Sequence, residues 1–174
     1  KRLYNAALHL RGGKVAGSHR KVLLPTYDVF DEERYFEPGT ALTRLELEGG
    51  PCFLSLCEDI WNDKTFWTRR IYHHDPVEEL VRAGATTIVN LSASPFSAGK
   101  HRRREEMLSS MARKYLVPLV YVNQYGGNDD LVFDGRSCGF RRRPFGSTLP
   151  SITARVSKAP NTTSVRRPPG SSGT

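Results

Sequence analysis

Short apolar runs alternate with amphipathic segments along the first 140 residues. Runs rich in Val, Ile and Leu that are bounded by Gly, Pro or polar residues are typical of buried strands, whereas apolar residues spaced three to four positions apart predict helices. The pattern predicts strands at 3–10, 15–24, 41–47, 52–56, 86–91, 118–124 and 131–133, and helices at 75–83 and 100–115. Strands that alternate with helices indicate an α/β fold. The turn signal at 11–14 predicts an N-terminal hairpin, which would make the sheet mixed.

The two predicted helices are marked by different signals. The first has an N-cap Asp, a Pro at the first helical position, two early Glu and a closing Gly (Asp75, Pro76, Glu78, Glu79 and Gly84). The second has an apolar stripe at positions 108, 111, 112 and 115, which predicts one buried face. Its basic run, Arg102 to Arg104, precedes two Glu and is expected to face solvent.

Composition divides the chain at residue 140. The 34 residues from 141 to 174 contain seven basic and no acidic residues, although the whole chain has a net charge of only +8. They are rich in Pro, Ser and Thr and have no hydrophobic periodicity, which predicts a disordered basic tail. The first 140 residues are therefore nearly neutral, and their charge does not indicate a nucleic-acid partner for this folded part.

Other features limit the cellular setting and the kind of chemistry. No apolar run approaches the roughly 18 residues that a membrane span needs. Three sparse cysteines give no disulfide framework and favour a reducing cytoplasm. The adjacent pair His73-His74 has no metal-ligand spacing, so no metal site is expected. The chain begins with Lys1 rather than Met, which indicates a piece of a longer protein.

Cys57 is the first candidate for chemistry. It ends the apolar strand 52–56 and precedes Glu58 and Asp59. A thiol at the carboxyl end of a buried strand can face a cleft and act as a nucleophile. The simpler alternative is a small buried hydrophobe, and the two neighbouring carboxylates would raise the thiol pKa. A nucleophilic Cys57 would therefore need a cation to hold its thiolate.

Lys21 could be that cation. It precedes the apolar residues 22–24, where a Lys side chain is normally solvated or extends its ammonium to water, but can also be desolvated in a cleft. The loop 27–39 follows it and mixes aromatic and charged residues at a density typical of loops that line a site. An ordinary packed loop remains the alternative.

Five segments together resemble the nitrilase (carbon-nitrogen hydrolase) superfamily, and most closely the glutaminase domains of glutamine-dependent NAD synthetases. They are Arg20-Lys-Val-Leu-Leu-Pro25, Tyr27-Asp-Val-Phe-Asp-Glu-Glu-Arg-Tyr-Phe36, Cys57-Glu-Asp-Ile-Trp61, Asn90-Leu-Ser-Ala-Ser-Pro-Phe96, and Val122-Asn-Gln-Tyr-Gly-Gly-Asn128 with Asp134-Gly135. They occur in the family's order and cover about residues 1–140. The resemblance implies an α-β-β-α sandwich, of which this chain would hold a part.

The resemblance also implies roles for eight residues. Cys57 matches the nucleophile, and Lys21 matches the cation that holds the thiolate and then the oxyanion, helped by a backbone N–H after the Cys. Glu32 matches a Glu that orders the site, with Glu33 as the alternative. Residues around the glutamine substrate are Tyr27, Phe30, Glu58 and Ser94. Lys100 stands where some relatives have Arg, so its grip on the substrate carboxylate would be weaker.

The chain departs from the family at both ends. The family's general-base Glu would lie on a strand before residue 1, so we expect the chain alone to be weak or inactive. From Arg141 onward the resemblance stops, although the family continues into further strands and an ATP-dependent synthetase domain. We therefore expect a partial hydrolase domain at 1–140 and an unrelated tail at 141–174.

The function that the resemblance implies is release of ammonia from glutamine through a Cys thioester, for ATP-dependent NAD synthesis. This domain would need no cofactor, because ATP and Mg would serve only the absent synthetase domain. The full-length parent would be a cytoplasmic homo-oligomer. Two alternatives remain, a free-standing nitrilase-family amidase and a non-catalytic fragment that binds nucleic acid through its basic tail.

Overall fold

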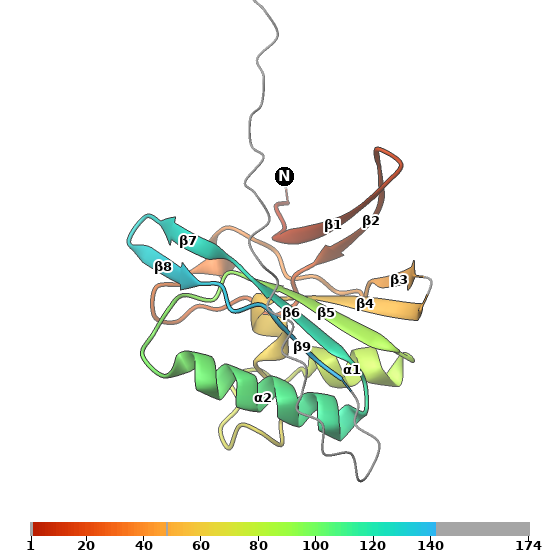
Figure 1. Cartoon of the computed structure of the whole chain (residues 1–174). Helices are drawn as coiled ribbons and strands as arrows, with labels where there is room; N and C mark the ends of the chain where they lie inside the picture. The colour runs from red at the N-terminus through yellow and green to blue at the C-terminus, as the bar shows by residue number, and fades with distance from the viewer. Residues whose placement is uncertain (1, 48, 142–174) are drawn as a thin grey trace, which may run out of the picture.

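A five-stranded mixed sheet lies at the centre of the protein, in a computed structural model that describes residues 2–47 and 49–141 (Figure 1). The strand order is β3-β4-β5-β6-β9. The three middle strands are parallel, and both edge strands run antiparallel to their neighbours. The bounds are β3 Arg44–Leu47, β4 Gly50–Leu56, β5 Thr87–Ser92, β6 Leu119–Asn123 and β9 Cys138–Phe140.

Two helices cover one face of this sheet (Figure 1). Helix α1, Pro76–Arg82, connects β4 to β5, and helix α2, Lys100–Tyr115, connects β5 to β6. The Asp75 side chain accepts a hydrogen bond from the Glu78 backbone N–H and caps α1 as its sequence predicts. The main hydrophobic core lies between helices and sheet and includes Phe53, Ile88 and Leu119 from the strands and Leu80, Leu108 and Met111 from the helices.

A hairpin of β1, Ala6–Arg11, and β2, Lys14–Arg20, lies on the other side of the sheet (Figure 1). Ala7 of the hairpin packs with Leu54 and Leu56 of β4 in a second, smaller core. The described layers are therefore helices, central sheet and hairpin. This arrangement agrees with the predicted partial sandwich, in which a second β layer covers the first.

The remaining elements are short and lie near the carboxyl ends of the parallel strands. A small hairpin is formed by β7, Tyr125–Asn128, and β8, Leu131–Asp134. One single-turn 3₁₀ helix, η1, spans Glu32–Arg34, and a second, η2, spans Cys57–Ile60 directly after β4. No helix in the described part of the chain is long and apolar enough to cross a membrane.

The predicted α/β fold is confirmed. The predicted mixed sheet is confirmed too, but other strands than the predicted ones make it mixed. The N-terminal hairpin forms its own two-stranded sheet, and the edge strands β3 and β9 make the central sheet mixed. The predicted second strand is also too long, because β2 ends at Arg20 and residues 21–24 leave the ladder. Strands β7 and β9 were missed, since segments of three or four residues carry almost no periodic signal.

The expected solvent-facing basic run on α2 is wrong for Arg104, which is 1% exposed. Its Nη2 lies 3.2 Å from Asp134 Oδ1, and its guanidinium lies over the Tyr121 ring. The acidic partner comes from β8, 30 residues further along the chain, so local spacing on the helix gave no sign of it. The predicted disordered tail falls outside the described residues from 142 onward.

Leu108→Ala should lower the free energy of unfolding by about 2–5 kcal/mol, because it deletes a fully buried side chain and leaves a cavity between α2 and the sheet. Urea unfolding followed by tryptophan fluorescence measures the change. Leu10→Ala is the matched control: Leu10 is 66% exposed on the hairpin, and its truncation should change stability by no more than about 0.5 kcal/mol. Equal effects at the two positions would contradict the described core.

Candidate active site

A cavity of about 440 Å³ opens at the carboxyl ends of β4 and β5. All eight residues that the sequence singles out line it, namely Lys21, Tyr27, Phe30, Glu32, Cys57, Glu58, Ser94 and Lys100. They come from the segment after the hairpin, the loop before β3, the turn after β4, the segment after β5 and the start of α2. Folding therefore gathers into one pocket residues that are up to 79 positions apart.

Cys57 occupies a strained position at the entrance to η2. Its φ is +41°, in the left-handed region that non-glycine residues rarely adopt, and the preceding Leu56 is still extended. The chain thus turns sharply at the residue that bears the thiol. Strain of this kind is concentrated at functional sites, where surrounding contacts maintain it.

The surroundings of the Cys57 thiol include groups that raise its pKa and groups that lower it. Burial raises the pKa of the Cys57 thiol above its ordinary value. The Lys21 ammonium is the largest influence that lowers this pKa, and the Ala93 backbone N–H and the Ser92 hydroxyl lower it further. The Glu58 carboxylate raises it, as the sequence suggested. The cation that Cys57 needs is thus present in the same pocket.

Lys21 is buried, with 1% of its surface exposed, and its Nζ donates a hydrogen bond of 2.5 Å to Glu32 Oε1. The other oxygen of Glu32 accepts from the Asn5 side chain at 3.2 Å. The Lys21 ammonium is therefore desolvated and held from one side by a carboxylate. Glu33, the sequence alternative to Glu32, is exposed and does not line the cavity.

Glu58 is a second buried carboxylate on the cavity wall, with 6% of its surface exposed. Tyr27 Oη donates a hydrogen bond of 2.6 Å to Glu58 Oε1. Burial raises the pKa of Glu58, while the Tyr27 hydroxyl and the Lys21 ammonium oppose that rise. The Phe30 ring packs edge-on against Tyr27, with centroids 6.3 Å apart. These contacts fix the Glu58 carboxylate against an aromatic wall.

Lys100 and Ser94 also line the cavity, Ser94 in the segment after β5 and Lys100 at the start of α2. Lys100 is the first residue of α2, and its Nζ lies 5.6 Å from the centre of the Trp61 ring. Burial lowers the pKa of Lys100, and the nearby Cys57 and Glu58 raise it. Ser94 is 2% exposed, and its hydroxyl has no hydrogen-bond partner among the described residues.

Sequence reasoning missed the residues that hold the segment after β5. Asn123, at the end of β6, accepts from the Ser94 backbone N–H at 2.9 Å and donates to Asp134 at 3.3 Å, and Asp134 pairs with Arg104. This network fixes Ser94, the residue directly after Ala93, whose N–H faces the Cys57 thiol. The polar residues that follow a buried strand at 92–94 were the available signal. Their partners are set only by strand pairing.

Relatives of known function match most of the described chain. It is 46% identical over 137 residues to the glutamine-dependent NAD(+) synthetase of Synechocystis, and 41% identical over 138 residues to that of Thermotoga maritima. These matches cover 79% and 77% of this chain but only 25% and 22% of the relatives. No family model matches the chain.

Solved structures agree with the sequence relatives. The glutamine-dependent NAD+ synthetase of Acinetobacter baumannii superposes with a TM-score of 0.71 at 37% identity, over 80% of this chain and 24% of that one. The amidase of Nesterenkonia sp. AN1, from the nitrilase superfamily, gives a TM-score of 0.60 at 24% identity, over 81% of this chain and 47% of that one. The chain therefore has the fold of a nitrilase-superfamily amidase. It spans about a quarter of the length of the NAD+ synthetases that it matches.

The shared fold explains why these residues meet, but their roles stay predictions. Cys57 and Lys21 line one cavity. The remaining six predicted residues line the same cavity. Among the described residues, no cluster of three or more His, Cys, Asp or Glu side chains could hold a metal ion.

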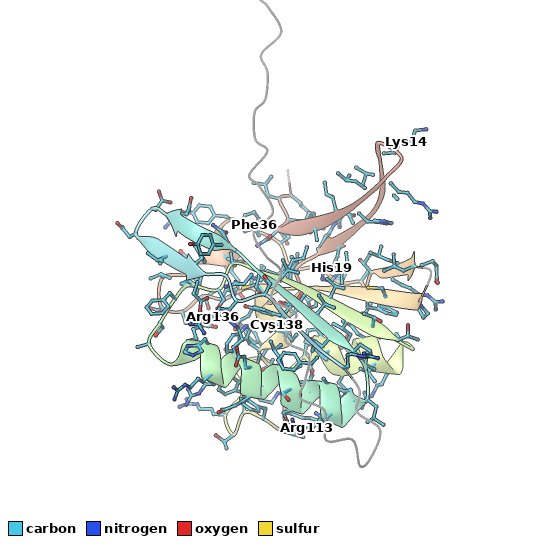
Figure 2. The ribbon with its side chains drawn as sticks, in the orientation of Figure 1. Lys14, His19, Phe36, Arg113, Arg136 and Cys138 are labelled. Atoms are coloured by element: carbon cyan, nitrogen blue, oxygen red, sulfur yellow. The ribbon has the colours of Figure 1, made fainter. Side chains whose placement is uncertain are left out.

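Lys21→Met should slow alkylation of Cys57 by iodoacetamide at pH 7 by roughly three- to tenfold. The substitution removes the largest influence that lowers the Cys57 pKa, so the midpoint of the rate–pH profile should move to higher pH. The greater nucleophilicity of a higher-pKa thiolate offsets part of the loss. Lys14→Met, at the exposed tip of the hairpin (Figure 2), is the control and should leave the profile unchanged. An unchanged profile for Lys21→Met would contradict an electrostatic influence of Lys21 on the Cys57 thiol.

Proposed function

We propose that this chain is the glutamine-hydrolysing part of a glutamine-dependent NAD+ synthetase. The observation that carries the proposal is a thiol and a buried ammonium in one cavity, Cys57 and Lys21, in a chain whose relatives bear that name. A structure of the Nesterenkonia amidase, which matches in fold, shows covalent addition of the acetamide moiety of fluoroacetamide at its active-site cysteine. That adduct supports the same chemical role for Cys57.

The reaction begins with attack of Cys57 Sγ on the side-chain amide carbon of glutamine. A C–S bond forms, the C–N bond breaks, and the amide nitrogen leaves as ammonia with the proton of the thiol. Water then hydrolyses the glutamyl thioester, which releases glutamate and restores the thiol. Lys21 stabilises first the thiolate and then the negative oxygen of the tetrahedral intermediates. Glu32 holds Lys21 in place for both steps.

The charges of the cavity support an amino acid as substrate. Glu58 provides a buried negative group for the α-ammonium of glutamine, and Lys100 provides a positive group for its α-carboxylate. Tyr27 and Phe30 pack along the aliphatic part, and the unpartnered Ser94 hydroxyl offers one further hydrogen bond. A free-standing amidase for simple neutral amides would have little use for two opposite charges beside the thiol.

The wider role of the protein is part of the same proposal. The ammonia would serve an ATP-dependent amidation in a synthetase domain, which corresponds to the length of the relatives that this chain does not span. We place the glutaminase step in the cytoplasm, in a homo-oligomeric parent, and without a cofactor of its own. The free state of Cys52, Cys57 and Cys138 supports a reducing compartment.

A glutamine analogue that carries a diazoketone in place of the side-chain amide tests the proposal directly. It should label the chain once, at Cys57, because that thiol lines the cavity whereas Cys52 and Cys138 are 1% and 3% exposed in the cores. Peptide mapping by mass spectrometry identifies the site, and Cys57→Ala should abolish labelling. A label on another residue, or one that excess glutamine does not suppress, would overturn the assignment.

Glu58→Gln should weaken protection of Cys57 by glutamine. The half-protecting glutamine concentration against iodoacetamide should rise about tenfold, because a buried charged partner for the α-ammonium is replaced by a neutral one. This concentration is independent of the small gain in thiol reactivity that loss of the Glu58 charge produces. Glu33→Gln is the matched control, since Glu33 is exposed outside the cavity. Equal protection of both variants would exclude Glu58 from the glutamine site.

A further inference from the structure

Asp59 is a buried carboxylate that accepts hydrogen bonds from four donors. It is 1% exposed and lies two residues after Cys57. Its Oδ1 accepts from the backbone N–H groups of Val22 and Leu23, at 3.0 and 2.8 Å. Its Oδ2 accepts from the backbone N–H of Leu56 at 2.9 Å and lies 3.3 Å from His19 Nε2. Asp59 does not line the cavity and therefore does not touch the substrate position.

The four donors belong to two segments that carry the reactive groups. Val22 and Leu23 directly follow Lys21, and Leu56 directly precedes Cys57. We propose that Asp59 is a positioning residue, which joins these segments through one carboxylate and so sets the approach of the Lys21 ammonium to the Cys57 thiol. The inference rests on the proposed function, in which Lys21 and Cys57 act as a pair.

The segment after β2 depends on this carboxylate because the strand ladder has already ended. The Lys21 backbone N–H still donates to the Asn5 carbonyl at 2.8 Å, and the Lys21 carbonyl accepts from the Gly39 N–H at 2.7 Å. For the next two N–H groups the described acceptor is Asp59 Oδ1. Leu23 is buried and Val22 is half-buried, so water has no access to the first residue and limited access to the second. Without Asp59, the backbone that carries Lys21 would lose its attachment to the turn at Cys57.

His19 completes the arrangement from the hairpin side. His19 belongs to β2 and is 2% exposed, and its side chain lies on the side of β2 that faces the central sheet (Figure 2). A carboxylate only accepts hydrogen bonds, so the Nε2 that faces Asp59 Oδ2 carries the proton. His19 Nδ1 has no partner among the described residues. The bond to Asp59 is therefore the polar anchor of His19, and it ties the end of β2 to the same carboxylate.

An asparagine cannot replace Asp59 in this position. Its amide has a single acceptor oxygen, and in either orientation the NH₂ group would face backbone N–H donors. The substitution also removes a negative charge close to Cys57. A purely electrostatic role for Asp59 would make the Asn variant more reactive, because loss of a neighbouring carboxylate lowers a thiol pKa. A positioning role predicts a less reactive Asn variant, so the change in alkylation rate distinguishes the two roles.

The test is the pH profile of Cys57 alkylation by iodoacetamide in the 174-residue chain, with the modified residue located by peptide mapping. For Asp59→Asn we expect a rate at pH 7 that is roughly three- to tenfold lower, with a midpoint at higher pH. Asp63→Asn is the matched control. Asp63 is equally buried at 1% exposed, and it accepts from Thr65, Phe66 and Lys114 without contacting either reactive segment. Its profile should stay unchanged.

A second comparison uses the Lys21→Met background. If Asp59 acts through Lys21, Asp59→Asn should slow alkylation in the native chain but add little to Lys21→Met. An independent slowing of the same size in both backgrounds would show a general structural role and overturn the proposal. So would a faster rate for Asp59→Asn, or equal effects of Asp59→Asn and Asp63→Asn.

The outcomes also separate this inference from the proposed function. If Lys21→Met leaves the profile unchanged, the Lys21–Cys57 pair fails and Asp59 falls with it. If Lys21→Met slows the reaction and Asp59→Asn does not, only the positioning role is lost. Should Asp59→Asn not fold, His19→Leu removes one of the four donors and should slow alkylation in the same direction by a smaller factor. An unchanged profile for His19→Leu would then overturn the proposal.

Discussion

The parallel pairing of β4, β5 and β6 is the constraint on which the site depends. Because the strands run in the same direction, the turn at Cys57, the segment 92–94 and the side chain of Asn123 all emerge at one edge of the sheet. The buried apolar faces of the strands fix this register, since a slip by one residue would turn every side chain to the opposite face. The strand register thereby places the thiol, the N–H of Ala93 and the amide of Asn123 at the same edge.

The cavity itself is assembled from all three layers. The sheet contributes Cys57 and Ser94, the helical layer contributes Lys100, and the chain that leaves the hairpin contributes Lys21 and the loop with Glu32. Two hydrophobic cores hold the layers together, a main one between the helices and the sheet and a smaller one between the sheet and the hairpin. A cleft at the carboxyl edge of parallel strands is the usual location of ligand sites in α/β sheets. In this protein the chain that leaves the hairpin covers the cleft and places the Lys21 ammonium in it.

Buried polar and charged side chains connect these layers. Three pairs of largely buried side chains come from different elements: Lys21 with Glu32, Arg104 with Asp134, and Asp59 with His19. Pairs of this kind contribute little net stability, because desolvation offsets most of their attraction. Removal of one partner is nevertheless costly, which makes them effective at fixing one relative placement of the elements. In this protein they all surround the turn at Cys57 and the segment 92–94.

The sequence by itself determined the elements that have a strong periodic signal. The apolar runs 52–56, 86–91 and 118–124 and the capped helix at Asp75 are local patterns, and local propensity and burial are enough to specify them. It also singled out Cys57, Lys21 and Glu58 as candidates, which the structure places in one cavity, because motif order along the chain is visible without coordinates. Only the tertiary structure decided that Glu32 rather than Glu33 meets Lys21, that Arg104 is buried against Asp134, and that Asp59 joins two distant backbone segments. Those contacts span 11 to 37 positions, and they arise from strand pairing and layer packing, which no local pattern of residues encodes.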